Sequence, residues 1–273
     1  MRLGRSIVCL FLLGCDPFPV LGNGDKTTRE LSFEDFDGVE NSGELDVHVL
    51  RGGDFAVQVT IDDNLHRYVD IWVDAGTLRI DTTRSLDFRG TGRINIVMPR
   101  LLDGTLSGSG NLEIEGVGPI EDTEISLLGS GNIDVCGSLR SLTAEVSGSG
   151  SLRACAGSDR SLELLVLSSS GSGDFVWDGP VDTFEIEGRG SGDFRLSGRG
   201  RALVVGIRGS GSLDAVGFSV TQAELRTSGS GGIRAFVEER ATVRISGSGD
   251  VNLWGPAELE LESDTGSGSV IRH

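Results

Sequence analysis

The sequence is poor in the residue types that most active sites and nucleic-acid interfaces require. Its 273 residues include 3 His, 4 Cys and 1 Tyr, and aromatic residues make up 5%. The 24 Lys and Arg are outnumbered by 41 Asp and Glu, which gives a formal net charge of −17. This charge argues against nucleic acid as a partner, because no basic surface is available to neutralise phosphates. The 6 Pro are few enough to permit long, continuous backbone ladders.

No apolar run approaches the roughly 20 residues that a membrane-spanning helix needs. Residues 1–15 instead look like an export signal, because Arg2 and Arg5 precede a short apolar run. The end of this segment, Leu12-Leu13-Gly14-Cys15, resembles a bacterial lipoprotein signal, in which Cys15 is lipidated. An ordinary signal or a chance Cys is the alternative. We therefore expect a palmitate-type anchor at Cys15, a tether over residues 16–29, and a place at the outer membrane, on its periplasmic side or the cell surface.

Glycine is abundant, with 42 residues, and it is periodic. The motif Gly-Ser-Gly returns nine times along the C-terminal two thirds of the chain, at intervals of 18 to 23 residues; its copies begin at Gly108, Gly129, Gly148, Gly171, Gly190, Gly209, Gly229, Gly247 and Gly266. A period near 20 is typical of a stacked repeat array, in which each repeat forms one coil. We expect the glycines to permit tight bends with left-handed torsions that other residues avoid.

Apolar residues alternate with polar ones after each motif, as in Leu112-Glu113-Ile114 and Ile133-Asp134-Val135. A period of two predicts half-buried strands rather than helices. Short strands that stack in register from coil to coil give a parallel β-helix, or β-solenoid, with about 20 residues per coil. We expect one such domain over residues 30–273, with the repeat coils in residues 107–273.

Residues 30–106 are rich in predicted strands but lack the motif, and we expect N-terminal coils and a cap there. The segments Phe36-Asp37-Gly38-Val39, Gly43-Glu44-Leu45-Asp46-Val47, Asp62-Asp63-Asn64-Leu65 and Gly76-Thr77-Leu78-Arg79-Ile80, followed by Leu106-Ser107-Gly108-Ser109-Gly110, resemble the bacterial auto-transporter adhesin head domain, also called the GIN domain. The resemblance covers about residues 33–271. It implies a right-handed parallel β-helix on an exported or lipid-anchored protein. It implies no catalytic residues, because the family has no established set of them.

Two cysteines, Cys136 and Cys155, follow their motifs at the same distance. In adjacent coils their Cα atoms would lie about 5 Å apart, which is within the range of a disulfide. Export to an oxidising compartment favours the bond, and two stacked thiols are the alternative.

The residue after each motif is often Asn, Asp or Ser, types that commonly bond local backbone in turns. We expect no metal site, with one exception kept as a hypothesis. Asp174 and Asp193 would stack as like charges on adjacent coils, and a weak calcium site could form between them.

Trp177 lies at a position of its coil whose side chain is predicted to point inward. Phe236 and Trp254 lie one residue beyond the equivalent inward position of their own coils, which are consecutive. We therefore place Trp177 in the core and predict a binding patch at Phe236 and Trp254.

These features favour a non-enzymatic exported protein, adhesin-like or a scaffold, without a cofactor and with a protein or glycan partner or end-to-end self-association. His48, His66 and His273 are dispersed, so a Ser/His/Asp site is not indicated. A glycan-active β-helix enzyme is the main alternative, and it would need clustered carboxylates on one outer face. Outward residues Asp134, Arg153, Arg195, Asp214 and Arg234 instead vary in type like a solvated face. An envelope sensor or regulatory partner is a third possibility.

Overall fold

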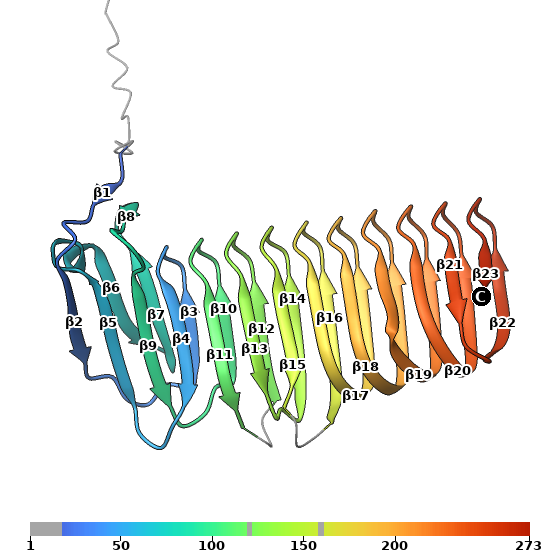
Figure 1. Cartoon of the computed structure of the whole chain (residues 1–273), viewed down its shortest axis with the longest axis horizontal. Helices are drawn as coiled ribbons and strands as arrows, with labels where there is room; N and C mark the ends of the chain where they lie inside the picture. The colour runs from blue at the N-terminus through green and yellow to red at the C-terminus, as the bar shows by residue number, and fades with distance from the viewer. Residues whose placement is uncertain (1–17, 119–121, 158–160) are drawn as a thin grey trace, which may run out of the picture.

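The computed structural model describes residues 18–118, 122–157 and 161–273. It is nearly all β, with 61% strand and 2% helix, and its parallel coils stack into a β-solenoid. The coils form an elongated rod with the N-terminal elements at one end and the C-terminus at the other (Figure 1). The predicted export signal and Cys15 lie outside the described residues. Within these residues no helix has the length and apolar character to cross a membrane.

Each repeat coil consists of two strands and two bends. A departing strand leaves the Gly-Ser-Gly corner, and a returning strand leads to the next corner. The departing strands are β11 (Leu112–Val117), β13 (Ile133–Gly137) and β15 (Leu152–Ala156), and the returning strands are β10 (Asp103–Leu106), β12 (Asp122–Leu127), β14 (Ser141–Val146) and β16 (Leu162–Ser169). Each strand pairs in parallel with its equivalent in the next coil. The coils therefore form two facing sheets.

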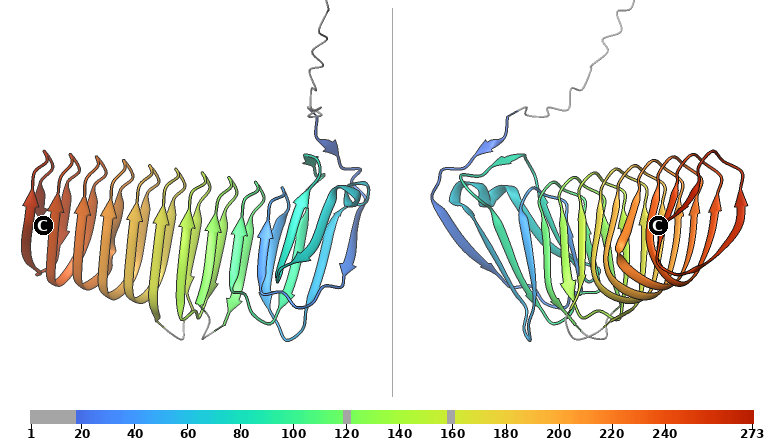
Figure 2. Two further views of the ribbon diagram at one scale, coloured as in Figure 1. Left: turned by 180° about the vertical axis from the view of Figure 1, so that it is seen from behind. Right: turned by 45° about the vertical axis from the view of Figure 1, so that its right-hand side comes forward.

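Towards the C-terminus the two strands of a coil merge into one long strand that curves around the second bend (Figure 2). These are β17 (Phe175–Gly188), β18 (Phe194–Ile207), β19 (Leu213–Thr227) and β20 (Ile233–Ile245). The last coils are again divided, into β21 (Val251–Trp254), β22 (Glu258–Asp264) and β23 (Val270–Arg272). Among the described residues, β22 and β23 each have a strand partner on one side only.

At the N-terminal end the spatial order of the coils differs from their order in the sequence. The coil of β3 (Gly38–Asn41) and β4 (Asp46–Arg51) lies between the coil of β7 (Thr77–Thr82) and β9 (Arg93–Met98) and the coil of β10 and β11. Strand β4 therefore pairs with β11, although residues 52–111, which include the coil of β7 and β9, separate them in the chain, and Val47 aligns with Leu112. This insertion breaks the regular period that holds elsewhere.

Antiparallel strands cover this end of the rod. Strand β2 (Lys26–Leu31) pairs with β5 (Ala56–Asp62), β5 pairs with β9, and β6 (Val69–Asp74) pairs with β7. The short strands β1 (Val20–Leu21) and β8 (Leu86–Asp87) pair beside them. The 3-10 helix η1 (Asp63–Tyr68) connects β5 to β6. These elements cap this end of the rod, and they include residues 20–21 and 26–29, so the predicted tether is wrong for those residues.

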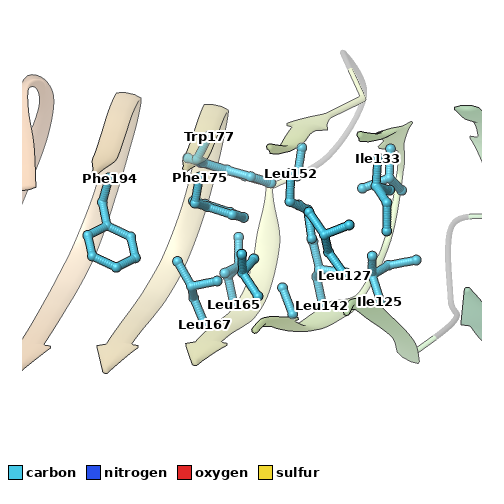
Figure 3. Close-up of a cluster of buried hydrophobic side chains, with 14 of the residues drawn as sticks. Ile125, Leu127, Ile133, Leu142, Leu152, Leu165, Leu167, Phe175, Trp177 and Phe194 are labelled. Carbon is cyan, nitrogen blue, oxygen red and sulfur yellow. The ribbon is translucent and has the colours of Figure 1, made fainter. Parts of the chain in front are cut away.

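The core lies between the facing sheets, and the alternation of the strands fills it. Ile133, Leu152, Phe175 and Phe194 are stacked from coil to coil, with Leu127, Leu142 and Leu165 facing them (Figure 3). Trp177 is 1% exposed, so its predicted place in the core is confirmed. Its indole N–H donates to the Gly179 carbonyl at 3.0 Å. The core is one continuous apolar column along the rod.

The Gly-Ser-Gly corners align along one edge of the rod (Figure 1), but the predicted reason for their glycines is wrong. None of the motif glycines, all of which the structure describes, has a positive φ. A Cβ on either glycine of a repeat would instead lie 1.7 to 2.2 Å from a backbone oxygen of the preceding coil. Left-handed torsions occur at the other bend, at Gly179 (φ 134°) and Gly198 (φ 123°). The corners need glycine because the backbones approach too closely for a side chain.

Candidate functional site

A ladder of side-chain hydrogen bonds runs beside the Gly-Ser-Gly corners. At the position after several of the motifs, and at the equivalent residue Asp46, a side-chain oxygen accepts from the backbone N–H of the equivalent residue one coil on, at 2.8 to 3.3 Å; the pairs are Asp46 and Asn111, Asn111 and Asn132, Asn132 and Ser151, Asp174 and Asp193, Asp193 and Ser212, Ser212 and Gly232, and Asp250 and Ser269. The expectation of local turn bonds is therefore wrong. These side chains join neighbouring coils because the coil register places each beside the next N–H.

Asp174 and Asp193 belong to this ladder, and both are exposed. One oxygen of Asp174 accepts from the Asp193 N–H at 2.8 Å, and one of Asp193 accepts from the Ser212 N–H at 2.8 Å. The N–H groups and solvent thus offset the repulsion between like charges. In the described part of the chain neither residue belongs to a group of three convergent metal-ligating side chains. Calcium binding there stays a prediction.

The structure joins Cys136 and Cys155 in a disulfide, with their Cα atoms 4.7 Å apart. The two residues are register partners in β13 and β15. Both side chains lie on the outer surface of the departing sheet, where Cys136 is exposed and Cys155 half-buried. The bond covalently links two consecutive coils at a position open to reductants.

We expect the exported protein to contain this bond, and its removal to lower the free energy of unfolding. Closing a loop of about 20 residues in the unfolded chain stabilises the folded state by about 3 kcal/mol in the chain-entropy model. The double variant Cys136→Ser/Cys155→Ser should therefore melt at a lower temperature than the oxidised protein. Intact-mass measurement with and without reductant checks the bond itself. Two alkylatable thiols in the unreduced, exported protein would contradict it.

Phe236 and Trp254, the predicted binding patch, are register partners in β20 and β21, and both are half-buried. The Trp254 ring stacks on the His273 ring, with centroids 4.2 Å apart and planes at 7°. The Arg234 guanidinium carbon lies 5.3 Å from the Trp254 centroid. Arg234 and His273 come from the coils on either side of β21, so they cover both ring faces. The stack restrains the Trp254 ring and leaves only its edge uncovered by these two side chains; binding at Phe236 and Trp254 stays a prediction.

The outward row of the departing sheet has the mixed character expected of a solvated face. Arg153 pairs with Asp134 at 3.1 Å and Arg234 pairs with Asp214 at 3.1 Å, each between adjacent coils. All four side chains are largely exposed to water, where such pairs contribute little. Arg195 is exposed in the same row.

An open groove of about 550 Å³ lies over the second bend of the long-strand coils. Its carboxylates, Asp182 and Glu238, are already engaged. Arg201 donates two hydrogen bonds to Asp182, both at 3.0 Å, and the Ser219 hydroxyl donates to Glu238 at 2.6 Å. Burial and the charge of Glu124 raise the pKa of the Asp103 carboxyl, but Asp103 does not line the groove. The described residues that line the groove thus do not present the free acid and base pair that a glycan-cleaving site needs.

One cluster was missed by sequence reasoning. His48, Glu113 and Glu115 converge on the outer face of β4 and β11, with one ligating atom of each within 4.8 Å of the others. His48 and Glu113 are far apart in the chain, because cap strands and the coil of β7 and β9 lie between them in the sequence, although β4 and β11 are neighbours in space. The period of the repeats offers no signal for such a pairing, because it relates only equivalent positions in consecutive repeats.

A comparison with protein-family models matches residues 35–166 and 158–257 to "Putative auto-transporter adhesin, head GIN domain". A comparison with curated proteins gives no match.

Solved structures share the fold over nearly the whole chain. One, described as "putative adhesin" from Parabacteroides distasonis, has a TM-score of 0.67 at 22% identity and covers 94% of this chain and 100% of its own. A second from the same organism, described as "putative lipid binding protein", has a TM-score of 0.67 at 24% identity with the same coverage. A "putative adhesin" from Parabacteroides merdae has a TM-score of 0.64 at 21% identity and covers 93% of this chain and 98% of its own. At these identities the likeness establishes the fold.

Proposed function

Because the chain belongs to the auto-transporter adhesin head GIN domain family, we propose that it is a lipid-anchored, adhesin-like binding protein of the cell envelope that catalyses no reaction. The observation that carries this proposal is the family match across residues 35–257, which includes most of the cap and of the repeat coils. The continuous apolar column supports it, since a rod packed along its length presents long, rigid outer faces. The engaged carboxylates of the groove favour binding over glycan cleavage.

The anchor is proposed at Cys15, and a bacterium grown with an alkyne analogue of palmitate tests it. We expect the wild-type chain to incorporate the label and to fractionate with the outer membrane. Cys15→Ser should abolish both, because the thiol accepts the lipid. Cys9→Ser, in the apolar run, is the matched control and should keep the label. Equal labelling of wild type and Cys15→Ser would contradict the anchor.

The contact surface is proposed at Phe236 and the edge of Trp254, with a protein as the partner. Aromatic side chains held rigid by neighbours lose little conformational entropy on binding and are common anchors of interfaces. The stacked Arg234 and His273 leave no free ring face for a sugar to stack on, which favours a protein over a glycan.

A pull-down with the full lipidated chain from its own envelope, after cross-linking, tests this surface. We expect a partner to be recovered with wild type and to be lost with Trp254→Ala. Leu128→Ala is the control, because Leu128 is a large apolar side chain, 46% exposed, in a different coil. Recovery of the same partner with Trp254→Ala would remove the patch from the proposal, and recovery of none from any envelope preparation would remove the adhesin-like role.

End-to-end association of two copies is proposed at the C-terminal coil. Strands β22 and β23 are paired on one side among the described residues, and Leu261 (51%) and Ile271 (41%) are exposed there. A free strand edge with apolar side chains is a template for another strand. Light scattering after size exclusion should show a dimer that Ile271→Lys reduces to monomer. A wild-type monomer at high concentration would refute the association.

A further inference from the structure

The cluster of His48, Glu113 and Glu115 is built by two neighbouring strands. His48 and Glu113 are direct register partners in β4 and β11, and Glu115 lies two residues further on the same face of β11. All three side chains therefore project from one side of the departing sheet. The three ligating atoms lie within 4.8 Å of one another. Regular strand geometry thus positions the three groups, without loops.

The His48 imidazole has a buried nitrogen that no group satisfies. The side chain is 16% exposed, and Nε2 has no hydrogen-bond partner among the described residues. Its nearest carboxylate oxygen, Glu115 Oε2, is 3.9 Å away, which is beyond hydrogen-bond range. A buried polar atom without a partner costs free energy, so its retention requires an explanation. A metal ion held between Nε2 and the carboxylates would provide the missing interaction.

The charges around the cluster favour a cation. Glu113 and Glu115 bring two carboxylates to the same face, and the guanidinium nearest Glu113 is that of Arg93, at 3.8 Å. The next carboxylate in the row, Asp134, is already paired with Arg153 at 3.1 Å. Among the described residues, the ion pairs of these two carboxylates are those of Glu113 with Arg93 at 3.8 Å and of Glu115 with His48 at 3.9 Å, so two negative charges lie beside one imidazole. A divalent ion would convert the repulsion between the two glutamates into attraction.

The ligand set selects the class of ion. An imidazole nitrogen suits zinc, copper, iron and nickel, whereas calcium and magnesium prefer all-oxygen sites. One His and two carboxylates leave a tetrahedral zinc ion one position for water, as in open zinc sites. Ligands at zinc distances lie about 3.4 Å apart, so the atoms must close by roughly an ångström. Glu113 and Glu115 are 44% and 56% exposed, so rotation of these side chains can provide that movement.

We propose that His48, Glu113 and Glu115 form a binding site for one divalent transition-metal ion, of which zinc is the best fit. The site lies at the junction of the N-terminal coils with the repeat coils, because β4 belongs to the inserted coil and β11 to the first repeat. A bound ion would tie the two together. The proposed metal site does not depend on the adhesin-like role or on the surface at Trp254.

Calorimetric titration of the full, metal-stripped chain with zinc chloride at neutral pH tests the proposal. We expect one equivalent of zinc to bind, and His48→Gln and Glu113→Gln/Glu115→Gln each to weaken binding at least about tenfold, the loss that even indirect supporting groups cause. Cobalt bound in place of zinc should show visible ligand-field bands that His48→Gln removes. Melting curves without metal establish that each variant is folded.

Two matched controls separate this site from adventitious binding. His66→Gln and His273→Gln remove the other histidines and should leave zinc affinity unchanged. Asp174→Asn/Asp193→Asn removes the acidic pair at the corners and should also leave it unchanged. Zinc binding by His48→Gln with wild-type affinity, or an absence of measurable binding by the folded wild type, would overturn the proposal.

Discussion

Gly209→Ala should abolish the stacking of two coils and lower the free energy of unfolding by about 4–5 kcal/mol, at the upper end for single substitutions. The new Cβ would lie 1.8 Å from the Gly190 carbonyl oxygen. The same oxygen accepts the Ser210 N–H at 3.1 Å, so the coils cannot separate without losing this bond. We expect the melting temperature to fall by about 10 °C or more, because 1 kcal/mol corresponds to about 2–4 °C at this size.

The control for this prediction is Gly53→Ala. Gly53 has no atom within 4 Å of a built Cβ, and its φ is not positive. Its substitution should change the free energy of unfolding by no more than about 0.5 kcal/mol. Thermal melts followed by circular dichroism measure both variants. Equal melting temperatures for the two would show that the corners tolerate a side chain and that close backbone approach does not explain the motif.

Phe184→Ala should have the next largest effect, a loss of about 3–5 kcal/mol. Phe184 is fully buried, and its ring makes edge contacts with Phe175, Trp177 and Phe218 at centroid distances of 6.2 to 6.3 Å. These rings come from β17 and β19, which lie on either side of β18. The cavity left by Phe184→Ala would therefore loosen the packing of more than one coil. Urea unfolding and thermal melts measure the change.

Phe18→Ala is the matched control, because Phe18 is 77% exposed and loses little contact on truncation. It should leave the stability within about 0.5 kcal/mol of wild type. A loss below about 1 kcal/mol for Phe184→Ala would contradict the assignment of these rings to one tightly packed core.

The repeat coils could be predicted because every signal there is local. The motif recurs once per coil, and the alternation that follows it places Leu112 or Phe175 inward whatever lies elsewhere in the chain. The disulfide partners follow from the same rule, since equal distances from consecutive motifs give register partners. The inward slot of Trp177 is another such case.

The contacts between coils were less predictable. The sequence shows glycine at each corner, but only the stacked backbones show that the obstacle is a carbonyl oxygen of the preceding coil rather than a left-handed torsion. The Asn, Asp and Ser after the motifs have the composition of turn residues, yet their bonds reach one coil on. The stacking of Trp254 between Arg234 and His273 likewise depends on three coils at once.

The sequence by itself determined the number and length of the repeat coils, because each needs its own corner and its own alternating strands. The tertiary structure alone decided the order of coils at the N-terminal end. Pairing between strands so distant in the sequence depends on which strand edges the cap leaves free, and no spacing in the chain encodes that. The juxtaposition of His48 with Glu113 and Glu115 is a product of this pairing, so it became visible only in the folded chain.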